Sequence, residues 1–155
     1  MKENERLRAI MDPWALVALV DGESLYGFVI EHAGTGGLSW VLSTPVVWLD
    51  PEAGQARTRS GRRYELGRRI EIGDLPDEEA RLAFAFLARP YLRDPSRIPP
   101  PPDPVTAMAW LTARKMARHL GLEPPPLKQE AAIKDFMTRN MRRYVEYRRS
   151  GQRFS

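Results

Sequence analysis

Six arginines lie within the thirteen residues 57–69, with a single glutamate among them; they are Arg57, Arg59, Arg62, Arg63, Arg68 and Arg69. A guanidinium group stays charged at any physiological pH and donates paired hydrogen bonds to phosphates and carboxylates. Arginines placed close together repel one another, and a phosphate backbone or an acidic protein surface would offset that repulsion. The segment therefore indicates an anion-binding site. The alternative is a solvated, arginine-rich sheet edge that discourages strand-to-strand aggregation.

A second basic segment closes the chain. Residues 134–155 hold seven Lys/Arg and two acids, and their candidate phosphate contacts are Arg139, Arg142, Arg143 and Arg149. Apolar residues recur there at helical spacing, which predicts an amphipathic helix. Its basic face could contact phosphates, or it could be a solvated face on a docked helix. The other 120 residues carry a net charge of −6, so positive charge is concentrated in two segments.

Residues suited to catalysis are sparse. The chain has no cysteine and two histidines, His32 and His119, which fall in no metal-ligand or catalytic-triad spacing. We therefore expect no catalytic residues, no metal and no cofactor, and a protein that is not an enzyme.

Short runs rich in β-branched and aromatic residues, separated by turn residues, would carry the first basic segment; they span 14–20, 25–31, 38–43 and 45–49. Such runs are typical of an antiparallel meander. Leu7, Ile10 and Met11 are at helical spacing and predict a short helix over residues 2–11. We expect an α+β fold: a meander or curled barrel of about five to seven strands, with this N-terminal helix and two or three C-terminal helices. An SH3-like barrel, an OB-like barrel and an open sheet all remain possible.

The loop length at Gly61 decides which side chains share a face of the arginine hairpin. A three-residue loop, Arg59-Ser60-Gly61, pairs Ala56 with Tyr64 and puts the apolar side chains on one face. Arg57, Arg63 and Glu65 then point outward. A two-residue loop would mix arginines with Tyr64, so the apolar pattern favours the longer loop. Ile70 and Ile72 are expected to continue as a last strand.

The remaining chain is predicted to be helical. Asp74 and the acids after it begin a helix that ends near Ala88, and Asp103 with Pro104 begins another that stops at Gly121. The last helix spans about residues 127–149. Residues 94–104 are rich in proline and predict a stiff spacer. The expected organisation is a meander domain over 1–93, the spacer, and a helical segment over 105–155 that packs on the first domain.

These observations predict a small nucleic-acid-associated protein, binding DNA or RNA by its phosphate backbone. The alternative is a protein-interaction module, or an accessory or inhibitor subunit, whose basic surface and helices dock on a partner protein. The longest apolar run has seven residues, well short of a membrane span, and the charged start has no signal-peptide character. We therefore expect a cytoplasmic protein without a membrane partner.

Overall fold

The computed structural model describes residues 8–32 and 37–151. The chain divides into two compact units, residues 1–99 and residues 100–155. Each unit has its own fold, and the two are taken in turn.

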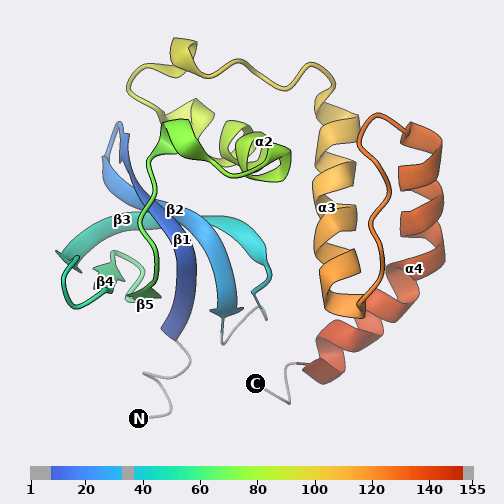
Figure 1. Cartoon of the computed structure of the whole chain (residues 1–155), viewed down its shortest axis with the longest axis horizontal. Coiled ribbons are helices and arrows are strands. Elements are labelled where there is room, and N and C mark those ends of the chain that lie inside the picture. Colours follow the sequence, from blue (N-terminus) through green and yellow to red (C-terminus); the bar gives the residue numbers. More distant parts are fainter. Residues whose placement is uncertain (1–7, 33–36, 152–155) are drawn as a thin grey trace. The chain divides into compact units, whose positions relative to one another are not determined.

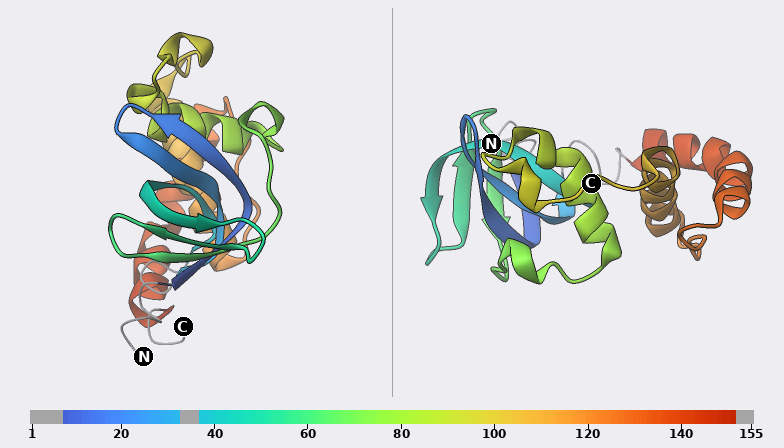
Figure 2. Two further views of the ribbon diagram at one scale, coloured as in Figure 1. Left: turned by 90° about the vertical axis from the view of Figure 1, so that its left-hand side faces the viewer. Right: turned by 90° about the horizontal axis from the view of Figure 1, so that it is seen from above.

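The first unit is a closed barrel of five strands in sequence order (Figure 1). The strands are β1 (Arg8–Leu19), β2 (Gly22–His32), β3 (Ser39–Asp50), β4 (Gln55–Thr58) and β5 (Arg63–Leu66). Each strand runs antiparallel to the one before it, so with an odd number of strands β1 and β5 point the same way. They close the barrel as a parallel pair. Figure 2 shows the long strands β1 and β2 curling past the short β4–β5 hairpin.

The helix predicted over residues 2–11 is wrong where the structure describes it. Arg8–Met11 begin β1; all four residues pair with β5, and the last three also pair with β2. Ala9 and Met11 are buried while Arg8 is exposed, so the side chains alternate with a period of two, as in a strand. Barrel closure depends on this segment, which explains why its helical spacing did not decide its structure. Residues 2–7 lie outside the described residues.

The strand predicted at Ile70 and Ile72 is also absent. Arg69 forms an isolated bridge with Trp14, and Ile72–Asp74 form the short 3-10 helix η1. After β5 the chain follows β1 through only a few single bonds, such as Trp14 N donating to Arg68 O at 2.9 Å, before it turns into η1. In another of these bonds, Ile70 N donates to Trp14 O at 2.8 Å.

The register predicted for the arginine hairpin is confirmed. Ala56 lies opposite Tyr64 and Arg57 opposite Arg63, and Thr58 N donates to Arg62 O at 3.1 Å. Gly61 has φ of +88°, the left-handed conformation that a three-residue loop requires. Ala56, Thr58 and Tyr64 are buried, while Leu66 is only half-buried.

β3 joins two segments that the sequence pattern separates at Pro45. Its first half pairs with β2 and its second half with β4. Pro45 lies where the strand changes partner, so its missing N–H costs no ladder bond, and its carbonyl accepts from Arg59 N at 2.7 Å. A bulge follows between Val46 and Trp48.

The barrel interior is filled by a cluster of buried side chains: Ala9, Met11, Trp14, Leu25, Val29, Ala56 and Tyr64. The fit is close at Gly27, where a Cβ atom would come within 2.3 Å of the Pro13 carbonyl oxygen. Glycine is therefore required where β2 crosses β1.

One part of the outer surface of the barrel is covered by the helix α2 (Glu78–Leu87), above the strands in Figure 1. The helix begins at Asp77, whose side chain accepts from Ala80 N, and not at Asp74, which belongs to η1. Its buried residues include Ala80, Ala83 and Phe84, whereas the larger Leu82 and Phe86 are half-buried and Leu87 is exposed. Tyr26 of β2 donates its hydroxyl to Ala80 O at 2.5 Å and meets Phe84 edge-on. Small alanines allow this close approach.

The second unit is a helical hairpin of α3 (Pro104–Leu120) and α4 (Glu130–Gly151), which pack against each other. Asp103 caps α3 and Gly121 ends it with φ of +69°, as predicted. The buried side chains include Trp110, Ala113 and Phe136, whereas Met141 is exposed. Packing of this segment on the barrel unit stays a prediction.

The stretch 94–104 is not extended throughout. Asp94 caps the 3-10 helix η3 (Pro95–Arg97), and Arg89 Nε donates to Ile98 O at 2.7 Å. Another 3-10 helix of three residues, η2 (Arg89–Tyr91), follows α2. Over residues 8–32 and 37–151, no helix combines the length and the apolar character needed to span a bilayer.

Candidate functional site

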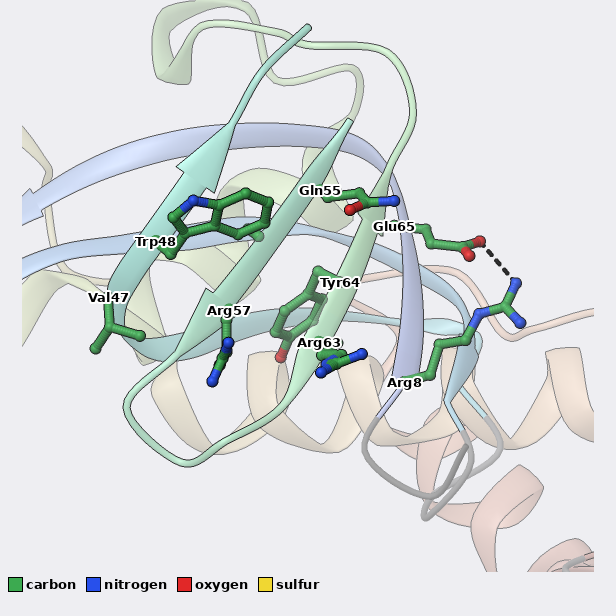
Figure 3. A pocket seen from close by; sticks show the side chains of 9 residues that line it. Arg8, Val47, Trp48, Gln55, Arg57, Arg63, Tyr64 and Glu65 are labelled. Carbon is green, nitrogen blue, oxygen red and sulfur yellow. Dashed lines mark hydrogen bonds and ion pairs between the residues drawn. The ribbon is translucent and has the colours of Figure 1, made fainter. Parts of the chain in front are cut away.

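A row of four side chains crosses the outer face of the barrel at right angles to the strands. Trp48 of β3 lies opposite Arg57 of β4, Arg57 opposite Arg63 of β5, and Arg63 opposite Arg8 of β1. Three inter-strand spacings of about 4.8 Å give this row a length of about 14 Å. We call these four residues the cross-strand row; Figure 3 shows all of them.

The row borders an open depression of about 630 Å³. Val47, Gln55 and Glu65 also line it, together with the buried residues Ala56 and Tyr64. α2 covers a different part of the barrel, around Tyr26.

The bulge in β3 explains how a tryptophan enters this face. Strict alternation would place Val46 and Trp48 on the same side of the strand. The extra residue shifts the phase, so Val46 packs against the core while Val47 and Trp48 both point outward. Trp48 is 49% exposed, whereas the other three tryptophans of the chain are no more than 8% exposed.

Charges in the row are only partly compensated. Arg8 Nη2 lies 2.7 Å from Glu65 Oε2 (dashed in Figure 3). Arg57 and Arg63 have no ion-pair partner among the described residues, although their Cβ atoms are about 5 Å apart across the ladder. Like charges directly opposite each other destabilise a sheet. The row therefore carries an electrostatic cost that a bound anion would offset.

Barrel closure removes the aggregation-blocking explanation for these arginines. That explanation requires a free strand edge to protect. β4 pairs with β3 and β5, and β5 pairs with β4 and β1, so neither strand of the hairpin is an edge. The repulsion has no protective role on these strands.

The other arginines predicted from residues 57–69 divide into two groups. Arg59 and Arg62 lie in the hairpin loop next to the row; Arg59 is exposed, and Arg62 is half-buried with Nη1 lacking a hydrogen-bond partner in the described residues. Arg68 and Arg69 lie farther along β1, on the order of 15–20 Å from Arg8. The guanidinium of Arg69 stacks 5.1 Å from the centre of the Trp14 ring. The structure therefore does not bring Arg68 and Arg69 into the cross-strand row.

The arginines of α4 form a weaker candidate. Arg139 pairs with Asp135 at 2.9 Å and Arg142 with Glu146 at 3.6 Å, each one helical turn apart and exposed. Arg143 and Arg149 are exposed. Half of the predicted contacts on this helix thus already have a carboxylate neighbour on the helix itself.

The histidines give no second site in the described structure. His119 is buried and meets the rings of Tyr144 and Tyr147 of α4, so it contributes to the packing of the helical hairpin. The His32 side chain lies outside what is described. No group of three or more potential metal ligands occurs over residues 8–32 and 37–151.

Sequence reasoning missed Trp48, Val47 and Arg8 as members of the site. Arg8 was assigned to a helix, and its position depends on the parallel pairing of β1 with β5, which closes the barrel across 55 residues of sequence. The bulge that turns Trp48 outward has no clear sequence signal. The one available indication is that Trp48, in the predicted strand run 45–49, is close in sequence to the arginine cluster.

No family model matches the chain, and comparisons with curated proteins and with solved structures give no match either. Function has to be inferred from the geometry and charge of the site itself.

Proposed function

We propose that the protein is a non-enzymatic nucleic-acid-binding protein and that the cross-strand row of its barrel contacts the phosphate backbone. The observation that carries the proposal is the direct opposition of Arg57 and Arg63, neither of which has an ion-pair partner among the described residues, on strands that are not edges. Guanidinium groups at this spacing suit successive phosphates, which they bind as paired donors.

Arg59 and Arg62 extend the positive surface at the loop end of the hairpin. The exposed arginines of α4 would add electrostatic attraction without specific contacts. Screening by salt limits the reach of that attraction to about 10 Å. This division makes the barrel the principal interface and α4 an accessory one.

The alternative is an interaction module that binds an acidic protein. The exposed Val47 beside Trp48 favours this alternative. A protein partner would bury these apolar side chains, whereas a phosphate backbone would leave them exposed to solvent. Both readings use the same arginines, so they differ in partner and not in surface.

A salt titration tests the proposal. Binding of a fluorescently labelled oligonucleotide is measured by anisotropy from about 50 to 200 mM salt, a range over which phosphate contacts weaken steeply. Arg57→Ser with Arg63→Ser should reduce the slope of log K against log salt by about 0.7–0.9 for each contact removed. Arg97→Ser, an exposed arginine on η3 of the same unit, should leave the slope unchanged. Wild-type protein that binds neither DNA nor RNA at about 50 mM salt refutes the proposal.

A further inference from the structure

The same surface also carries an aromatic ring, which a phosphate contact alone does not use. Trp48 stands at one end of the cross-strand row, directly opposite Arg57, and half of its side chain is exposed. Leaving an indole in water forgoes the gain of burying it. The bulge at Val46–Trp48 is what turns this ring outward onto the charged face.

We infer, on the basis of the proposed function, that the site takes single-stranded nucleic acid, with one base stacked on Trp48 and the adjoining phosphates on Arg57, Arg63 and Arg8. A base inside a duplex has both faces covered by its neighbours, so a side chain that offers a ring face requires an unpaired base. Aromatic platforms beside a basic groove bind single strands in this way and tolerate any base.

The dimensions of the row limit what it holds. Its length of about 14 Å accommodates about four nucleotides at the stacked spacing of 3.4 Å per nucleotide, and fewer in an extended strand. The strand would cross β3, β4, β5 and β1 in turn, with its base end over the depression that Trp48 and Val47 border. The three arginines set an upper limit of about 2 on the magnitude of the salt slope for this row, since each single-strand phosphate contributes about 0.7.

Trp48 also provides the readout. Trp14, Trp40 and Trp110 are buried, so a quencher or a stacking base reaches Trp48 far more readily than any other tryptophan. A short oligothymidylate should quench the intrinsic fluorescence of the wild-type protein. In Trp48→Phe the quench should disappear while binding persists, because phenylalanine still offers a ring. Trp48→Ala should weaken single-strand binding about 5- to 150-fold, as expected for one lost stacking contact.

Controls separate stacking from charge and from folding. Tyr91→Ala removes an exposed aromatic from η2 and should leave binding unchanged. Inorganic polyphosphate, a base-free polyanion, should compete with the oligothymidylate only weakly and should not quench Trp48. The thermal unfolding midpoint of each variant shows whether the fold is intact.

Three outcomes decide the inference. Quenching by oligothymidylate, together with weaker binding by Trp48→Ala, supports it. Tighter binding to a duplex, or equal competition by polyphosphate without quenching, overturns the single-strand inference and leaves the proposed function standing. Failure of both single-stranded and duplex nucleic acid to bind overturns the proposed function, and the inference with it.

Discussion

Arg57 and Arg63 lie directly opposite each other on β4 and β5, with both side chains on the outer face of a closed barrel. Their inward neighbours Ala56 and Tyr64 are buried in the core, so the register cannot slip without exposing Tyr64. The core thus fixes an arrangement that is electrostatically unfavourable on the surface.

Relieving that repulsion should not destabilise the protein. Arg63→Thr keeps a residue of high strand propensity and removes one of the opposed charges, so we expect the free energy of unfolding in urea to stay the same or rise by up to about 1 kcal/mol. Arg8→Thr, which instead breaks the ion pair with Glu65, is the matched comparison. A loss of more than about 1 kcal/mol for Arg63→Thr would give Arg63 a structural role and weaken the functional interpretation.

Removing the acid of the site should strengthen binding. Glu65→Gln removes the negative charge 2.7 Å from Arg8, so we expect tighter oligonucleotide binding and a salt slope larger by up to about 0.7 for a single strand. The pair is about half exposed, so its loss should cost at most about 1 kcal/mol of stability. Glu78→Gln removes the same charge from α2 and should change binding less. Unchanged affinity for Glu65→Gln would exclude Arg8 from the interface.

The hairpin register has a direct consequence for stability. Tyr64→Ala should lower the free energy of unfolding by roughly 3 kcal/mol, as for other large-to-small changes of a buried aromatic residue. Arg57 follows Ala56, the partner of Tyr64, and its side chain points to the outer face. Arg57→Ala should therefore lower the free energy of unfolding by less than about 0.5 kcal/mol. Chemical denaturation measures the free energy of unfolding of both variants. Comparable decreases in the two would be inconsistent with this register.

Alkaline pH should destabilise the barrel unit through its buried tyrosines. Burial raises the pKa of Tyr26 and of Tyr64, and the carboxylates of Glu79 and Asp77 raise the pKa of Tyr26 further. The unfolded chain releases these protons near pH 10 while the folded state still holds them, so stability is intact below pH 10 and falls above it. The loss per tyrosine is at most about 1.4 kcal/mol per pH unit, the limiting slope between its unfolded and folded pKa. Tyr26→Phe should make the decline shallower, and an unaltered decline would show that other groups cause it.

The elements that local chemistry determines could be predicted from the sequence. Asp103 and Gly121 bound α3 as their capping preferences require, and Gly61 set the loop that fixes which hairpin residues face inward. In each case a few neighbouring residues contain the whole signal.

Features that depend on distant pairing could not be predicted. Arg8–Met11 adopt strand geometry because two partner strands flank them, and this tertiary demand overrides a helical spacing of only three residues. The same closure places Arg8 beside Arg63, and a one-residue bulge moves Trp48 to the outer face. The arginine cluster of residues 57–69 is visible in the sequence, but the sequence does not show that Trp48 and Arg8 join it.

Photochemical crosslinking tests the central claim, that the cross-strand row is the nucleic-acid interface, most directly. An oligothymidylate carrying 4-thiothymidine is bound to the protein at about 50 mM salt and irradiated, and its attachment points are mapped by mass spectrometry. We predict crosslinks in peptides containing Trp48 and the hairpin residues Arg57 and Arg63, abolished in the Arg57→Ser, Arg63→Ser double variant. Crosslinks confined to α4, or none above those of the unbound control, would contradict this assignment.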